Sequence, residues 1–237
     1  MTKLSKRMSG AAEQIDRDKL HSPEEAVTIL KDMSKVKFDE TVELHIKTNA
    51  DTRHAEQMVR GVTLLPNGLG KPVRVLVFAR AEGVEIAKEA GADFVGEDDL
   101  IRDIEGGWLD FDISLATPDV MPKISKLGPI LGRKGLMPNP RSGTLVQARD
   151  LPRAIDEARR GRVEFRTDRT SIIHCPIGKI SFEASQLVDN LTVLIDAINQ
   201  EKPNDIKGSF FKTAFLTSTM GPGVQLDVQQ LLSLKTE

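Results

Sequence analysis

Two hydrophobic patterns occur along the chain, and each predicts a different kind of sheet. Over residues 38–47, apolar Val42, Leu44 and Ile46 alternate with polar residues, which predicts a half-buried strand of an antiparallel sheet. Residues 73–79 are almost continuously apolar, as expected of a strand that is covered on both faces. The chain therefore combines an antiparallel region with a region of different architecture.

The outer parts of the chain predict an α+β arrangement. Ser22 and Pro23 are residue types preferred at a helix start, so we expect a helix from this point. Apolar residues at helical spacing predict a long amphipathic helix over 184–200. We also expect a short helix at 53–59, a strand ending at Leu65, and strands at 163–166, 172–177, 179–182 and 210–218.

The middle of the chain alternates strands and helices. After the apolar strand we expect a helix at 83–90, a strand at 92–95, a helix at 98–105, a strand at 111–116, a helix after Pro118 and another at 151–160. This order indicates a small parallel sheet with helices on its faces.

We therefore predict a fold of class α/β plus α+β with two domains. A discontinuous α+β domain comprises residues 1–66 and 160–237, and an inserted α/β domain comprises residues 67–159. The chain would cross between them twice, near 66–72 and 159–161, and these crossings would form a hinge.

Composition narrows the class of protein. Hydrophobic residues make up 39% of the 237 residues, which is enough for packed cores. The single cysteine, Cys175, excludes an internal disulfide and fits a reducing compartment. No apolar run approaches the ~20 residues of a membrane span, so we expect a cytoplasmic protein without a membrane partner. Residues 1–10 carry bases and no acid, and we expect a solvated tail there.

Positive charge is concentrated in one segment, although the formal net charge is −2. Residues 126–143, the basic segment, contain four basic residues, four glycines and three prolines in a loop-like sequence. No acid occurs between Asp119 and Asp150, whereas the stretch from Glu82 to Asp112 has eleven acids and two bases. Glycine and proline fix the backbone while basic side chains suit a polyanion, so the segment is a candidate nucleic-acid contact.

Enzyme motifs are scarce. The middle region has neither a dinucleotide-binding glycine fingerprint nor a phosphate-binding P-loop, and the histidines show no metal-ligand spacing. Cys175 follows His174, but neighbouring strand residues point to opposite faces, so the two are poorly placed as nucleophile and base. We predict no catalytic residue, no metal and no cofactor, and we interpret Cys175 as a packing residue.

Two polar surfaces remain. The exposed side of the early strand, from Phe38 to His45, is by itself most simply a solvated strand face. In residues 217–223, three hydroxyl side chains lead into a Gly-Pro-Gly bend. This segment is either a capped strand end with a tight turn or a surface for close approach of RNA, where hydroxyls reach phosphates or 2′-hydroxyls.

Several blocks of the sequence resemble the bacterial ribosomal protein L-one family. They include Lys37–Glu43, Leu65–Lys71, Gly-Leu-Met-Pro-Asn-Pro at 135–140 and Ser-Thr-Met-Gly-Pro-Gly at 218–223. The similarity spans about residues 20 to 228, in order and without large gaps. The last two blocks are highly specific.

The resemblance implies a split β-α-β (RRM-like) domain made from both chain ends and a Rossmann-like inserted domain without a nucleotide. It also implies a monomer when free that joins the large ribosomal subunit and binds the mobile rRNA stalk beside the tRNA exit site. There it would assist the release of deacylated tRNA. The protein would further repress translation of its own operon mRNA.

Where the sequence matches the motifs of the family, the resemblance implies which residues bind RNA. The main rRNA surface would comprise Phe38, Thr41, Glu43, Thr217, Ser218, Thr219, Met220, Gly221 and Pro222, with Arg53, Arg166 and Lys179 as flanking contacts. The basic segment would supply a second RNA contact through Arg133, Lys134, Asn139 and Arg141.

Two other functions stay open from the sequence. A phosphate-handling α/β enzyme could hold a small anion with the basic segment, but the acid-free run supplies no acid–base partner nearby. An RNA-binding regulator outside the ribosome would differ only in its partner.

Overall fold

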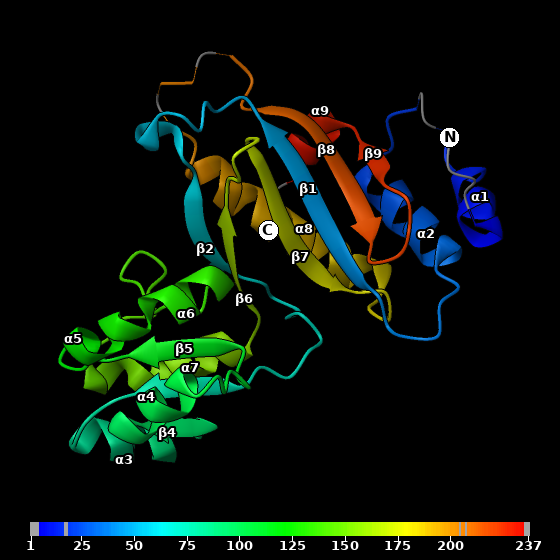
Figure 1. Cartoon of the computed structure of the whole chain (residues 1–237). Helices are drawn as coiled ribbons and strands as arrows, with labels where there is room; N and C mark the ends of the chain where they lie inside the picture. The colour runs from blue at the N-terminus through cyan, green and yellow to red at the C-terminus, as the bar shows by residue number, and fades with distance from the viewer. Residues whose placement is uncertain (1–4, 17–18, 204, 207, 235–237) are drawn as a thin grey trace. The chain divides into compact units, whose positions relative to one another are not determined.

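The computed structural model describes residues 5–16, 19–203, 205–206 and 208–234 (Figure 1). The chain forms two compact units. The first contains both chain ends, up to Gly70 and from Val163, and the second runs from Lys71 to Arg162. The first carries an antiparallel sheet and the second a parallel one, so the mixed α/β class is as predicted.

The main sheet of the first unit has the strand order β7-β1-β8-β9. Strand β1 (Thr41–Thr48) lies between β7 (Ile172–Lys179) and β8 (Phe211–Ser218) and is antiparallel to both, and β9 (Val224–Leu226) extends the sheet. Every second residue of β1 is buried, which confirms the alternation, although the strand begins at Thr41 and not at Phe38. Helices α2 (Pro23–Met33) and α8 (Ala184–Gln200) cover one face of the sheet (Figure 1).

Both helices begin where side chains satisfy the free N–H groups of the first turn. Ser22 accepts a hydrogen bond from the Glu25 N–H at 3.2 Å, as its N-cap position predicts. Glu183 and Gln186 form a capping box at the start of α8. The predicted starts of these two helices are therefore confirmed, as is the predicted end of α8 at Gln200.

Several local predictions for this unit were wrong. Residues 53–59 contain only the 3-10 turn η1 (Ala55–Gln57). No strand covers 179–182, because β7 ends at Lys179 and the chain turns back there, with the Phe182 N–H bonded to the Lys179 carbonyl at 3.0 Å. Strand β9 and helix α9 (Val228–Ser233) were not predicted.

The described part of the basic tail, which we expected to be solvated, is largely helical, and its side chains are exposed or half-buried. Its first four residues lie outside the described part of the chain, but helix α1 (Lys6–Ala12) begins directly after them, with Ser5 as its N-cap. The Arg7 guanidinium donates a hydrogen bond to the Met220 carbonyl at 2.9 Å. A separate two-stranded sheet of this unit pairs β2 (Arg60–Leu64) with β6 (Arg162–Arg166).

The second unit has a parallel sheet with the strand order β4-β3-β5. The central strand β3 (Val75–Phe78) is buried throughout because alternate side chains enter hydrophobic clusters on its two faces. This confirms the interpretation of the apolar run. The other elements are β4 (Phe94–Gly96), β5 (Ile113–Ala116), α3 (Glu82–Glu89), α4 (Asp98–Glu105), α5 (Met121–Ile124), η2 (Ser125–Leu127), α6 (Gly128–Lys134), η3 (Ala148–Asp150) and α7 (Leu151–Arg159).

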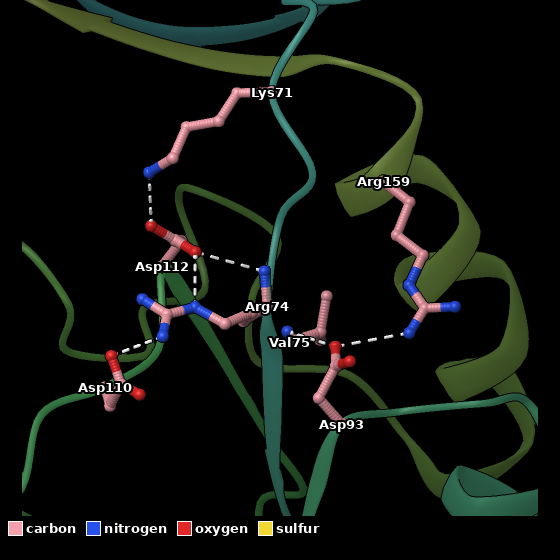
Figure 2. Close-up of polar contacts among 7 residues, drawn as sticks. All are labelled: Lys71, Arg74, Val75, Asp93, Asp110, Asp112 and Arg159. Carbon is pink, nitrogen blue, oxygen red and sulfur yellow. Dashed lines mark hydrogen bonds and ion pairs between the residues drawn. The ribbon is translucent and has the colours of Figure 1, made fainter.

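Ion pairs gather at one end of this parallel sheet (Figure 2). Asp112 accepts hydrogen bonds from Lys71 Nζ at 2.7 Å and from the Arg74 N–H at 3.1 Å, and Asp93 accepts one from Arg159 at 3.2 Å. Partial burial favours a higher pKa for Asp112, but the hydrogen bonds from Lys71 and Arg74 outweigh it and hold the pKa at about 2. The segments by which the chain enters and leaves the unit are thus both tied to its sheet.

Candidate nucleic-acid interface

The turn that presents Met220 is held from inside by a buried carboxylate. Glu40, which directly precedes β1, is only 1% exposed. One of its oxygens accepts hydrogen bonds from the Met220 N–H at 2.7 Å and the Ser218 hydroxyl at 3.2 Å, and the other accepts one from the Ser34 hydroxyl at 2.5 Å. These donors compensate the loss of water around the carboxylate. Sequence reasoning missed Glu40, because an acid just before a strand usually faces solvent.

The start of β1 and the end of β8 are joined next to this turn. The Thr219 N–H donates to the Thr41 carbonyl at 3.0 Å, and the Thr41 N–H donates to Thr219 Oγ1 at 2.9 Å. Lys179, at the end of β7, donates to the Thr41 hydroxyl at 2.8 Å. Glu43 and Thr217 lie opposite each other in the pairing of β1 with β8. The strand order therefore brings together side chains that are far apart in the sequence.

The exposed part of this region combines hydroxyl groups with large apolar side chains. Phe38 is 53% exposed and Met220 is 47% exposed, while Pro222 is half-buried. At Gly221 an added Cβ would lie 2.4 Å from Ser218 Oγ, so a larger residue there would displace the Ser218 hydroxyl that bonds to Glu40. Ser218 is buried and holds the turn instead of facing a ligand, unlike the role predicted for it.

We call this region the Met220 surface. Its members are Phe38, Thr41, Glu43, Lys179, Thr217, Thr219, Met220, Gly221 and Pro222.

Two predicted flanking residues lie elsewhere on the first unit. Arg53 follows the far end of β1 and lines a surface pocket of about 530 Å³ together with Lys47, Arg169 and Lys212. Arg166 lines a second pocket of about 600 Å³, which Arg169 also borders. These positions place several bases, interspersed with Asp51, Glu164 and Asp168, away from the Met220 turn. Arg169 and Lys212 were not singled out from the sequence, because isolated bases give no signal there.

A row of polar side chains crosses the sheet beside Glu43. His45 Nε2 lies 3.1 Å from Thr217 Oγ1, and His45 Nδ1 lies 2.8 Å from His174 Nδ1. On the other side, His174 Nε2 lies 3.6 Å from the Asp168 carboxylate. Burial and the neighbouring His174 lower the pKa of His45, and Glu43 offsets this only in part. The row was not predicted, because it depends on the register between strands.

The basic segment in the second unit is only partly a loop. Residues Gly128–Lys134 form helix α6, which packs into the core and ends at Gly135 with φ +71°. The predicted loop was wrong here because Pro129 sits in the first turn, where proline favours a helix. Beyond the helix, Asn139 Oδ1 accepts a hydrogen bond from the Arg141 N–H at 2.8 Å, so Asn139 shapes the turn that carries Arg141.

The cations of this segment are available to a ligand. Arg133, Lys134 and Arg141 are exposed, and no carboxylate of the described residues forms an ion pair with them. By contrast, Lys123 forms ion pairs with both Glu97 and Asp98. The acidic half of the unit thus neutralises nearby bases and leaves the basic segment with uncompensated charge.

The structure offers little for an enzyme. Cys175 is 1% exposed, and burial raises the pKa of its thiol to about 12, so it is not a nucleophile. His174 lies on the opposite face of β7, as predicted. Among the described residues, no group of three or more His, Cys, Asp or Glu side chains could hold a metal ion. Nor is any helix in this part of the chain long and apolar enough to cross a membrane.

Comparisons with known proteins show which sequences the chain is similar to. Residues 30–222 match the family model described as "Ribosomal protein L1p/L10e family". A protein of Dehalococcoides mccartyi named large ribosomal subunit protein uL1 is 50% identical over 234 residues, which are 99% of each chain. A protein of the same name from Thermomicrobium roseum is 53% identical over 229 residues, or 96% of this chain and 95% of that protein.

Proposed function

The chain belongs to the ribosomal protein L1p/L10e family, and we propose that it binds a helical junction of large-subunit rRNA through the Met220 surface. Members of this family are structural constituents of the ribosome and not enzymes. A phosphate-handling enzyme is therefore no longer an alternative. The names of the relatives support a place for this chain in the large subunit.

The turn anchored by Glu40 is the observation that carries the proposal. It fixes an exposed Met220 as an apolar contact for a sugar or base. The neighbouring Thr219 hydroxyl accepts from the Thr41 N–H and donates to the Thr41 carbonyl, which leaves one oxygen lone pair for a donor on the RNA. Lys179 adds a cation, and Glu43 can accept hydrogen bonds from 2′-hydroxyl or guanine amino groups. Phe38 adds an exposed ring on which a base can stack.

We propose the basic segment as a second RNA contact of more general character. Arg133, Lys134 and Arg141 would neutralise phosphates without reading sequence. The RRM-like and Rossmann-like units would then be two domains that reorient about the double chain crossing when RNA binds. Spin labels at the exposed positions Gln147 and Gln230 test this, because reorientation requires their distance distribution to change on addition of RNA.

Two finer functions follow from RNA binding beside the tRNA exit site. Binding to a mobile stalk would let the protein assist release of deacylated tRNA. Repression of its own operon would follow if the mRNA copies the shape of the rRNA site, because one rigid surface would accept both. A reporter that carries the operon leader tests repression, and it should lose control when Met220 is changed. Co-sedimentation with large subunits distinguishes a ribosomal protein from an RNA-binding regulator outside the ribosome.

The decisive experiment titrates a stalk-junction rRNA fragment with wild-type protein and with the double variant Thr219→Val, Met220→Ala at several salt concentrations. We expect the variant to lose about 2 to 3 kcal/mol of binding free energy, roughly 30- to 150-fold in affinity, because it removes hydrogen bonds and apolar contact. The slope of log affinity against log salt should change little, because no charge is removed.

A matched control for this titration is Thr28→Val, Met58→Ala. It changes the same residue types at exposed positions outside the Met220 surface. Because Met58 lines the pocket of Arg166, Thr28→Val, Leu232→Ala, with an exposed apolar residue of α9, serves as a second control away from both regions. Equal binding by wild type and the Thr219/Met220 variant would refute the site. Equal binding of stalk rRNA and unrelated structured RNA would refute the function.

A further inference from the structure

The polar row across the sheet of the first unit forms one continuous chain of contacts. It runs from Thr217 on β8 through His45 on β1 and His174 on β7 to Asp168 in the turn before β7. The atoms that face each other in the middle are both Nδ1 nitrogens, 2.8 Å apart. Such a contact is stable only if one nitrogen carries a hydrogen and the other a lone pair.

The carboxylate at the end of the row decides which nitrogen carries the hydrogen. A lone pair on His174 Nε2 would face the Asp168 oxygen at 3.6 Å and be repelled. A lone pair on His45 Nε2 would face the Glu43 carboxylate at 3.7 Å, but there the Thr217 hydroxyl, closer at 3.1 Å, can donate to it. The hydrogen is therefore better placed on His174 Nε2. In a neutral ring the other nitrogen, Nδ1, is then an acceptor, and it must receive its hydrogen from His45 Nδ1. His45 Nε2 in turn has only a lone pair, so it accepts the hydrogen of the Thr217 hydroxyl at 3.1 Å.

We propose that His45 and His174 are positioning residues that turn the Thr217 hydrogen toward the sheet, so that Thr217 offers only oxygen lone pairs to RNA. This inference rests on the proposed function, because Thr217 belongs to the Met220 surface. An oxygen that can only accept recognises a donor, which in RNA is a ribose 2′-hydroxyl or a base N–H. It is a poor partner for a phosphate oxygen, which has no hydrogen to give.

The lowered pKa of His45 fits this arrangement, because it keeps the ring neutral near pH 7. The half-buried position of Thr217 leaves its oxygen within reach of a ligand. The row thus gives a sheet surface a fixed hydrogen-bond direction, whereas an isolated hydroxyl rotates freely and can serve either as donor or acceptor.

The first test requires no RNA. Nitrogen-15 NMR of the full chain at neutral pH reports which nitrogen of each imidazole carries the hydrogen. We expect Nδ1–H for His45 and Nε2–H for His174, and we expect His45 to change tautomer in His174→Ala, which removes the acceptor at an exposed position. An Nε2–H tautomer for His45 in the wild type would overturn the proposal, whatever the protein binds.

The second test identifies the group that Thr217 recognises. Stalk-junction RNA with single 2′-deoxy, base-analogue or uncharged-phosphate substitutions is titrated with wild type and Thr217→Val. We expect one 2′-deoxy or base substitution to weaken wild-type binding about fivefold, the effect of one hydrogen bond, and to have no effect in the variant. Coupling of Thr217 to a phosphate substitution, or to none of the three, would overturn the inference. If the wild type showed no preference for stalk-junction RNA, the proposed function would be refuted instead. The NMR result would still decide which way the Thr217 hydrogen points.

Discussion

Replacement of Glu40 tests whether a residue that cannot touch RNA controls RNA binding. The side chain is 1% exposed, and its two oxygens accept three hydrogen bonds, from the Met220 N–H and from the hydroxyls of Ser34 and Ser218. In Glu40→Ala the two hydroxyls can rotate to other partners, but the Met220 N–H cannot. The variant leaves this partly buried backbone donor without its acceptor.

The expected magnitude follows from these contacts. A hydrogen bond to a charged group contributes about 1.5 to 3 kcal/mol, and a buried donor without a partner costs about 1 to 3 kcal/mol. Allowing for rotation of the two hydroxyls, we expect Glu40→Ala to lower the free energy of unfolding by about 3 to 4 kcal/mol. Since domains typically have 5 to 15 kcal/mol of stability, the protein should stay folded. Glu40→Gln keeps one acceptor oxygen and should lose only about 1 kcal/mol.

Urea unfolding and RNA titration together measure the two effects. We expect RNA affinity to fall at least tenfold in Glu40→Ala, because the Met220 turn loses its anchor, and to change little in Glu40→Gln. Glu24→Gln, at an exposed position of α2, is the control for loss of an acid. If Glu40→Ala unfolds at lower urea concentration yet binds RNA like the wild type, the turn does not need the buried carboxylate and the reasoning is refuted.

Three further predictions concern other parts of the molecule. Gly221→Ala should weaken RNA binding and cost about 1 to 3 kcal/mol in urea unfolding, because its Cβ would lie 2.4 Å from Ser218 Oγ. The double variant Arg133→Ala, Arg141→Ala should reduce the slope of log affinity against log salt by about 1 to 2 without changing selectivity among RNAs. Asp112 has a folded-state pKa of about 2, below its unfolded value, so its stabilisation is present above about pH 4 and lost as pH falls toward 2. The free energy of unfolding of wild type should therefore exceed that of Asp112→Asn by about 1 to 2 kcal/mol at pH 6, after allowance for solvent screening. This difference should vanish near pH 2.

Matched variants accompany these measurements. Gly132→Ala places a Cβ inside α6 where no atom lies within 4 Å, so it should stabilise the protein slightly, and a loss there would contradict the steric argument. Arg153→Ala removes a cation of α7 that is paired with Glu157 and should leave the salt slope unchanged. A pH-independent difference between wild type and Asp112→Asn would mean that the ion pairs of Lys71 and Arg74 do not stabilise the unit.

The sequence predicted the elements whose causes are local. The apolar run of β3, the alternation of β1, the cap at Ser22 and the helix Asp98–Glu105 depend on residues within a few positions of one another, and the structure has them almost as expected. Helix α6 was missed because glycine and proline permit both a loop and a helix start. The packing of its apolar side chains decided between them, and that depends on the rest of the unit.

The details of the candidate site depend on register, which sequence periodicity does not determine. His45 meets His174, and Thr41 meets Thr219, only because β1 pairs with strands more than 120 residues away at one specific offset. A shift by one residue would exchange the buried and exposed sides of β1. For this reason the members of the Met220 surface could be named from motifs, whereas the roles of Glu40 and Ser218 required coordinates.

The ion pairs at the end of the parallel sheet also bear on the order of folding. Strands β1 and β7 can pair only after the chain closes a loop that contains the whole second unit, roughly ninety residues, and closing such a loop with an unfolded chain costs about 4 kcal/mol of entropy. Once the second unit has folded, Lys71 and Arg159 are already fixed to its sheet (Figure 2). The remaining search then involves only the short segments on either side. The second unit would thus fold first and promote folding of the first unit. Variants that slow folding of the second unit should therefore delay formation of the antiparallel sheet.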